Sequence, residues 1–288
     1  MTCTLCPRNC RAERTADRPG GVCGMPLTPV VARAMLHQWE EPCLTGERGA
    51  GAVFFSGCPL RCVYCQNRPI SQGGVGKPVS AARLREIFQE LTARGAACLD
   101  LVTPTHFTPG ILEALGGEPW PVPVVWNCGG YEKPETLRLL EGRVQVYLPD
   151  LKYAGPAGKY SAAPDYFEYA APAILEMFRQ TGPCRMEAGQ LKSGVLIRHL
   201  LLPGELENTR RVIDWVSASF RPGDVLFSLM SQYTPQPGAS GALARHVTKA
   251  EYRAAVEYMK NCGITDGYTQ ERTSAREEYT PDFDLSGV

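Results

Sequence analysis

The chain has 288 residues, and its 30 lysines and arginines balance its 30 aspartates and glutamates, so its formal net charge is zero. This balance argues against binding to nucleic acid or to an anionic membrane surface. No apolar signal segment opens the chain and no stretch is long and apolar enough to cross a bilayer, which predicts a cytoplasmic protein with no membrane partner. Twelve cysteines in such a chain indicate metal or redox chemistry rather than disulfides.

A cysteine-rich segment comes first in the chain. Its thiols have the spacing C-x2-C-x3-C-x12-C and belong to Cys3, Cys6, Cys10 and Cys23. Four ligands in so short a stretch can close a metal site that holds zinc or a second iron–sulfur cluster. Interleaved arginines would offset the negative charge of four thiolates, although a basic surface loop or an RNA-contacting arm are alternatives. We expect residues 1–50 to form this metal-binding extension and a connector, in which Cys43 has no assigned role.

A second group of thiols follows an apolar strand expected at residues 52–56. Cys58, Cys62 and Cys65 have the spacing C-x3-C-x2-C. Three thiolates can hold a [4Fe-4S] cube and leave one iron open, and an open iron at a strand end can take the amino and carboxylate groups of S-adenosylmethionine (SAM). The alternatives are three thiols buried as small hydrophobic groups, and a zinc site with a further ligand.

Apolar runs and amphipathic helices alternate through the rest of the chain. The expected strands are residues 52–56, 97–102, 122–126, 144–148, 194–201 and 225–230. The expected helices are residues 80–94, 108–115, 133–140, 165–180, 208–218 and 249–261. We expect N-caps at Ser80 and Thr248 and a kink or break at Pro172.

Strict alternation implies parallel strands joined by right-handed crossovers. The predicted fold class is therefore α/β, a partial (β/α)6 barrel of parallel strands over residues 51–266 with a cysteine-rich N-terminal extension. Residues 267–288 are polar and interrupted by proline, so we expect a C-terminal tail on the surface with a frayed end.

Tyr64 stands directly before the last cysteine of the second group, where motifs of the radical SAM superfamily carry an aromatic residue. The chain resembles that superfamily in this motif, and residues 101–106, 147–153, 198–204 and 228–233 resemble its branch related to pyruvate formate-lyase activating enzyme. The resemblance implies an oxidoreductase whose reduced [4Fe-4S] cluster cleaves SAM to a 5′-deoxyadenosyl radical for hydrogen abstraction. It also implies an electron donor such as flavodoxin or ferredoxin. Either a glycyl radical enzyme, which the chain would activate, or a small molecule or peptide is the target.

Polar residues at the carboxyl ends of parallel strands are candidates for ligand binding. Thr103, Thr105 and His106 follow the second expected strand, where the resemblance implies a Gly-Gly-Glu phrase that supports the SAM amino group. The chain lacks that phrase, so we expect Thr105 or His106 to replace the acid. The alternative for His106 is a cap on the helix expected to begin at residue 108.

The next two strand ends supply further candidates. Asn127 resembles a residue near the SAM ribose, and the neighbouring Cys128 is expected to be a small buried residue. Asp150 and Lys152 match the Asp-x-Lys of the activating enzymes, which implies a lysine that neutralises the methionyl carboxylate. A surface salt bridge is the alternative reading of this pair.

The last two strands complete the predicted site. Arg198 and His199 are adjacent in a strand and should face opposite sides, because side chains alternate along a strand. We expect Arg198 to face the interior, where a guanidinium can grip a carboxylate or ribose hydroxyls, and His199 to pack among helices. Gln232 and Tyr233 should lie at the rim.

Two other classes of function compete with this prediction. A non-catalytic electron carrier or zinc-stabilised binding module would have fully ligated metals and no affinity for SAM. A radical SAM methylase of RNA would need Cys184 or Cys262 as a substrate-handling thiol, and the neutral charge balance argues against it.

Overall fold

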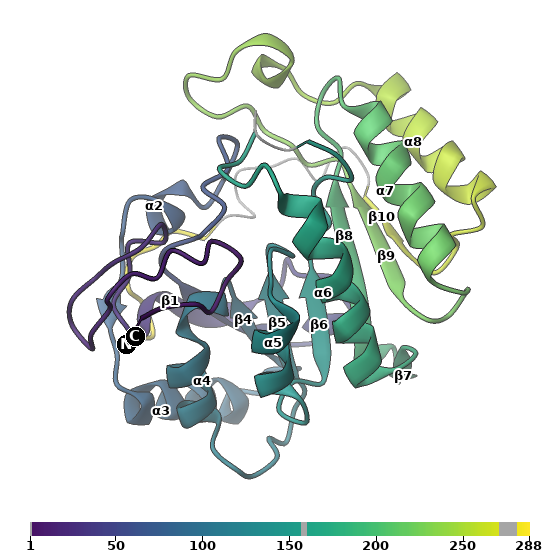
Figure 1. Cartoon of the computed structure of the whole chain (residues 1–288). Coiled ribbons are helices and arrows are strands. Elements are labelled where there is room, and N and C mark those ends of the chain that lie inside the picture. Colours follow the sequence, from purple (N-terminus) through teal and green to yellow (C-terminus); the bar gives the residue numbers. More distant parts are fainter. Residues whose placement is uncertain (1, 157–159, 271–280) are drawn as a thin grey trace.

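The computed structural model describes residues 2–156, 160–270 and 281–288. They form one mostly parallel sheet with the strand order β10-β9-β8-β6-β5-β4-β2-β1-β3, and β7 pairs with β8 (Figure 1). The strands are β1 (Val30–His37), β2 (Ala50–Phe55), β3 (Lys77–Pro78), β4 (Leu99–Val102), β5 (Val124–Cys128), β6 (Val146–Pro149), β7 (Arg185–Glu187), β8 (Gln190–Leu200), β9 (Leu226–Met230) and β10 (Gly267–Thr269). The helices are α1 (Pro42–Thr45), α2 (Arg68–Ser71), α3 (Ala81–Ala93), α4 (Thr108–Leu115), α5 (Pro134–Leu137), α6 (Tyr166–Thr181), α7 (Leu206–Ser219) and α8 (Lys249–Asn261).

The centre of the sheet consists of β2, β4, β5, β6, β8 and β9, which are neighbours in chain order and pair in parallel. These strands correspond to the six expected from the apolar runs, with ends shifted by a few residues. All residues of β2, β4, β5 and β6 are buried, as expected for strands covered on both faces. The α/β class with a mostly parallel sheet is thus confirmed. In the described residues the sheet stays open, with β3 and β10 at its ends.

Helices α3 to α8 cover one face of this sheet (Figure 1). Their apolar stripes and the sheet share one buried cluster, which includes Phe88 of α3, Trp126 of β5, Ile174 of α6 and Val212 of α7. The cavity described below lies at the carboxyl ends of the central strands. No helix among the described residues is both long and apolar enough to cross a membrane.

Local signals in the sequence set the helix ends. The hydroxyl of Ser80 accepts a hydrogen bond from the backbone of Arg83, and Thr248 forms a full capping box with Glu251. Helix α6, however, runs through Pro172 without a break, so the expected interruption is absent. A single proline removes one backbone hydrogen bond, and the buried stripe of α6 holds the helix against the sheet.

The edges of the sheet differ from the expectation. Residues 30–37, predicted as connector, form the long strand β1, which pairs antiparallel with β2. Residues 267–269, predicted as the start of a surface tail, form β10 and extend the sheet beyond β9. The chain end is also held, because Leu285 and Ser286 exchange backbone hydrogen bonds with β1. Much of the predicted frayed segment, residues 271–280, lies outside the described residues.

Candidate functional site

A cavity of about 770 Å³ lies at the carboxyl ends of the central strands. Its walls come from the loops after β1, β2, β4, β5, β6 and β9 and from β8, as expected for a ligand site of a parallel sheet. The predicted residues that line it are Cys58, Cys62, Tyr64, Cys65, Thr103, Thr105, Asn127, Asp150, Lys152, Arg198, Gln232 and Tyr233. The structure therefore brings nearly all of the predicted cofactor site together, whereas the N-terminal cysteines do not line this cavity.

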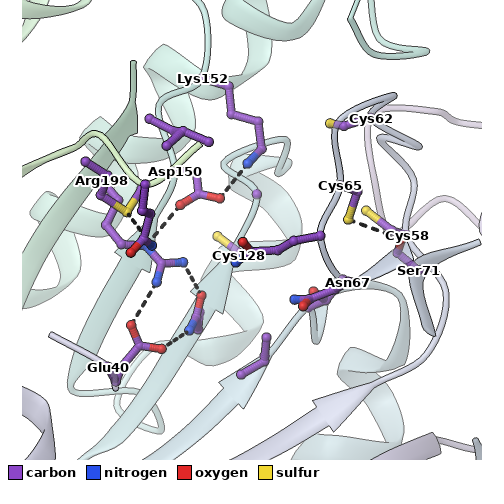
Figure 2. A pocket seen from close by; sticks show the side chains of 18 of the residues that line it. Glu40, Cys58, Cys62, Cys65, Asn67, Ser71, Cys128, Asp150, Lys152 and Arg198 are labelled. Atoms are coloured by element: carbon purple, nitrogen blue, oxygen red, sulfur yellow. Dashed lines mark hydrogen bonds and ion pairs between the residues drawn. The ribbon is translucent and has the colours of Figure 1, made fainter. Parts of the chain in front are cut away.

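Residues 57–66, here called the cysteine loop, present three thiols to the cavity (Figure 2). The loop begins at Gly57 and turns again at Arg61, both in the left-handed region with φ of 81° and 49°. The backbone N–H of Leu60 donates to Cys58 Sγ at 3.4 Å, and Ser71 Oγ donates to Cys65 Sγ at 3.3 Å. Donors aimed at sulfur stabilise thiolates, so the loop is built to keep its cysteines as ligands.

Burial controls the protonation of these thiols. Mainly through burial, and also through neighbouring thiolates, the pKa of Cys58 is raised to about 11 and that of Cys62 to about 12. The positive charge of Lys152 acts in the opposite direction on both groups. These two thiols are therefore protonated near neutral pH, and the positive charge of bound iron would hold them as thiolates.

The donor set fits an iron–sulfur cluster better than a single ion. In the described part of the chain, no three Cys, His, Asp or Glu side chains are arranged to hold one metal ion. The three sulfurs face the cavity from one loop, with space in front of them. The three thiols would hold a [4Fe-4S] cube, which needs only three protein ligands, whereas a structural zinc site would need a fourth.

Tyrosines form the wall beside the cysteine loop. Tyr64 OH lies 2.7 Å from Tyr153 OH, and the ring of Tyr64 lies 6.4 Å from the rings of both Tyr160 and Tyr233. Tyr64 thus lines the cavity as part of an aromatic group that packs the loop against the sheet ends.

The loop after β4 supplies two threonines to the cavity but not its histidine. The buried His106 Nε2 donates to the carbonyl of Ser56 at 2.7 Å, and His106 is not a lining residue. Burial lowers the pKa of His106 to about 4, so the ring is neutral. The structure therefore places His106 behind the cysteine loop as a support and not where it could replace the missing acid. Its ring does not cap the following helix either.

An acid that was not predicted lines the cavity from a different loop. Glu132, which follows β5 in the phrase Gly129-Gly130-Tyr131-Glu132, lines the cavity and accepts a hydrogen bond from Thr105 Oγ1. Its other oxygen, Oε2, is buried and has no hydrogen-bond partner among the described residues. Burial raises the pKa of Glu132 to about 8, which hydrogen bonds from Thr105 and Cys128 partly offset. The Gly-Gly-x-Glu spacing could have identified this residue, one strand later than expected.

Cys128 is buried, as predicted, but it also lines the cavity. Its contact with the carboxyl of Glu132 and its burial raise its pKa well above the ordinary value. The thiol therefore stays protonated beside Glu132.

An ion-pair network occupies the wall opposite the cysteine loop (Figure 2). Lys152 Nζ lies 2.5 Å from Asp150 Oδ2, and Arg198 Nε lies 3.0 Å from Asp150 Oδ1. Arg198 also contacts Glu40 Oε1 at 2.9 Å and donates to Asn127 Oδ1 at 2.6 Å. All three guanidinium nitrogens thus have protein partners, so Arg198 holds the wall in place. It also lines the cavity, where its expected grip on a carboxylate or ribose hydroxyls stays a prediction.

Glu40 is the network member that was not predicted. It lies just after β1, in the segment expected to be a connector, and also accepts a hydrogen bond from Asn127 Nδ2 at 3.0 Å.

The pKa of Asp150 is lowered, since the charges of Lys152 and Arg198 outweigh its burial. Burial alone would lower the pKa of Lys152, but Asp150 and Cys62 raise it above its usual value. Lys152 is therefore a permanent cation that faces the cysteine loop.

His199 faces away from the cavity, as the alternation along β8 predicts. Its Nδ1 lies 2.6 Å from the carbonyl of Leu151 and its Nε2 lies 2.9 Å from Thr209 Oγ1. Both ring nitrogens are thus satisfied in the helical layer.

Comparison with known proteins agrees with the cysteine loop. Residues 44–120 match the model of a 4Fe-4S single cluster domain, which contains all three of its cysteines. The uncharacterized protein MJ0674 of Methanocaldococcus jannaschii is 27% identical over 281 residues, which cover 91% of this chain and 75% of that protein. These matches support the expected [4Fe-4S] cluster and, with the C-x3-C-x2-C spacing, the expected radical SAM class.

Solved structures show a similar course of the chain. SuiB of Streptococcus suis bound to S-adenosylmethionine is 13% identical with a TM-score of 0.47, and the match covers 77% of this chain and 50% of SuiB. QueE of Escherichia coli is 9% identical with a TM-score of 0.45, and the match covers 85% of this chain and 94% of QueE. The chain thus spans about half the length of SuiB, and likeness at this level does not bear on what it binds.

Proposed function

We propose that this chain is a radical SAM enzyme, with a [4Fe-4S] cluster on Cys58, Cys62 and Cys65 and SAM in the adjoining cavity. The observation that carries the proposal is that these thiols, within a 4Fe-4S domain match, face the cavity that also contains the buried cation Lys152. When bound, the reduced cluster and SAM supply a 5′-deoxyadenosyl radical, which takes a hydrogen atom from a substrate. A flavodoxin or ferredoxin is the proposed electron donor.

The test of this proposal is SAM cleavage. Protein reconstituted without oxygen with iron and sulfide, then given SAM and dithionite, is expected to release 5′-deoxyadenosine and methionine in equal amounts. Chromatography quantifies both products, and samples without dithionite serve as the control. Product at no more than the control level, from protein that carries its full iron content, would contradict the proposal.

Lys152 is the proposed partner of the methionyl carboxylate of SAM. It is a cation at the cavity wall, its side chain is only 18% exposed, and Asp150 fixes its ammonium group. Asp150 is in turn held by Arg198. The lysine also offsets the negative charge of the thiolates across the cavity, since it lowers the pKa of both Cys58 and Cys62.

The substitution Lys152→Met is expected to weaken SAM binding at least about 30-fold, because removing one partner of a buried charge pair costs about 2 kcal/mol or more. Calorimetric titration of the reconstituted protein measures the affinity. Lys192→Met is the matched control, because Lys192 lies on β8 and does not line the cavity, and its ammonium group donates to Gln190 Oε1 at 2.7 Å. Equal affinity in the two variants would remove Lys152 from the site.

Glu132 is the proposed partner of the SAM ammonium group. Its free Oε2 is a buried acceptor at the cavity wall, and no cation is among the groups that shift its pKa. A buried carboxyl in this state gains an ion pair and a charge-assisted hydrogen bond from an ammonium guest. Thr105 positions the carboxyl through its hydrogen bond, which supports Glu132 in the role of the acid expected near Thr105.

The substitution Glu132→Gln should weaken SAM binding about tenfold, since a hydrogen bond to a charged group exceeds a neutral one by about 1.5 kcal/mol. The shape of the side chain is kept, so the unfolding temperature should change little. Glu135→Gln in the first turn of α5 is the control, because that glutamate does not line the cavity. Unchanged affinity in Glu132→Gln would show that the ammonium group binds elsewhere.

The proposed target of the radical is a glycyl radical enzyme, which this chain would activate. The support is the Asp150-x-Lys152 phrase at the cavity wall, which resembles the activating enzymes. Incubation of the reduced enzyme and SAM with a candidate partner should give a glycyl radical signal in electron paramagnetic resonance. If 5′-deoxyadenosine forms but no candidate partner acquires the signal, a small molecule or peptide becomes the proposed target.

A further inference from the structure

Two tight turns carry the four N-terminal cysteines. In the first, Cys3 N donates to Ala12 O and Asn9 N donates to Cys6 O, each at 3.0 Å. Asn9 has a φ of 43°, in the left-handed region, which allows a tight turn between Cys6 and Cys10. In the second, residues 20–25, Cys23 Sγ donates to Gly20 O at 3.7 Å. Turns of this kind bring side chains that are distant in sequence to one place.

Contacts bring three of these thiols to the second turn. Cys10 Sγ packs against it, since a Cβ on Gly21 would lie 2.8 Å from that sulfur. Cys3 is joined to the same turn through Arg14, which donates both to Cys3 Sγ and to the carbonyl of Met25. All four are free thiols, so no disulfide explains why they gather.

A buried arginine stands beside this thiol group. Arg14 is 0% exposed, and it donates to Cys3 Sγ at 3.3 Å and to the carbonyl of Met25 at 2.8 Å. A buried guanidinium that donates a hydrogen bond to sulfur stabilises the thiolate form. A divalent metal bound by four thiolates carries a net negative charge, which this cation would offset.

The same segment is fastened to the back of the cysteine loop. Arg8 Nε donates to the carbonyl of Pro59 at 2.8 Å, and Arg61 of the loop donates to the carbonyl of Val22 at 3.3 Å. A Cβ on Gly57 would lie 2.8 Å from the carbonyl oxygen of Cys23, so the two backbones are in close contact. The segment therefore links its own thiols to the loop that carries the other three.

We infer that Cys3, Cys6, Cys10 and Cys23 bind a second, thiolate-ligated metal centre, a zinc ion or an iron–sulfur cluster, which fastens the cysteine loop from behind. In the described residues no three of these groups are already arranged to hold one ion, so metal binding would require the thiols to turn toward one another. The segment has few apolar residues besides its thiols, and the metal would supply much of its folding free energy. This inference does not depend on SAM cleavage.

Metal analysis in a background without the first cluster tests the site. In the triple variant Cys58→Ala, Cys62→Ala, Cys65→Ala, purified without oxygen, we expect either about one zinc per chain or about four irons with sulfide. Adding Cys3→Ser and Cys6→Ser should remove that metal, whereas Cys262→Ser should not. A triple variant without bound metal, or metal that survives the added N-terminal substitutions, would overturn the inference.

The fastening role has its own measurement. In the full reconstituted protein, Arg8→Ala removes the hydrogen bond to Pro59 and should release iron from the first cluster to a chelator about fivefold faster, the equivalent of about 1 kcal/mol. Arg18→Ala, on the exposed side of the segment, should release iron at the original rate. Because Arg8→Ala leaves every cysteine in place, it remains informative if the cysteine variants fail to fold. Equal rates in both arginine variants would refute the fastening role.

Discussion

The substitution Cys62→Ala is expected to reduce 5′-deoxyadenosine formation to background and to remove most iron from the first cluster. Cys62 is the most deeply placed thiol of the cysteine loop, with 7% of the residue exposed. Burial has the largest effect on the pKa of Cys62, and the charge of Lys152, which lowers that pKa, has the second largest. Two remaining thiolates cannot hold a cube that needs three, so the effect should exceed that of any substitution in the SAM pocket.

Iron and sulfide content, the visible absorbance of the cluster and product formation measure this prediction. Cys43→Ala is the matched control, because Cys43 is 1% exposed, belongs to a separate buried cluster and does not line the cavity. That variant loses a thiol of similar burial but should keep its iron and activity. Full iron content in Cys62→Ala would instead mean that a different residue ligates the cluster. Parallel unfolding curves separate loss of the cluster from loss of the fold.

The central strands were predictable because their burial comes from local composition. A parallel strand covered on both faces must be apolar throughout, and β2, β4, β5 and β6 satisfy this condition in every residue. β1 includes the charged Arg33 and partly exposed positions, and its partners are β2, residues 77–78 and the chain end. The formation of β1 depends on contacts with distant segments, and the local pattern of apolar residues does not reveal such contacts.

The same distinction applies to the site. Asp150 and Lys152 could be placed because the end of a parallel strand fixes where such residues point. Glu40 and Glu132 could not, because each becomes part of the site through a partner from another element. Glu40 meets Arg198 across the sheet, and Glu132 meets Thr105 across two loops. Sequence reasoning thus located the correct edge of the sheet but not all of its acids.

The substitution Arg198→Met should lower the free energy of unfolding by about 3–5 kcal/mol, the usual effect of leaving buried charges without their partner. Arg198 is 15% exposed at the side chain, and its ion-pair partners Glu40 and Asp150 are 12% and 19% exposed. Arg83→Met is the control, because that arginine pairs with Glu86 and Glu90, whose side chains are 60% and 52% exposed. A surface pair should contribute no more than about 1 kcal/mol. Urea unfolding of the reconstituted protein measures both.

The pH dependence of this loss identifies its cause. Burial raises the pKa of Glu41 to about 7 and that of Asp100 well above its usual value, and in both cases Arg198 counteracts the shift. Without Arg198 these values rise further, and a carboxyl with a raised pKa in the folded state destabilises the fold as pH increases through that pKa. The deficit of Arg198→Met relative to the unmodified chain should therefore be largest near pH 8 and shrink toward about pH 5, where the carboxyls are protonated. A deficit that is equal at both pH values would assign the effect to lost packing of the arginine side chain and not to uncompensated charge.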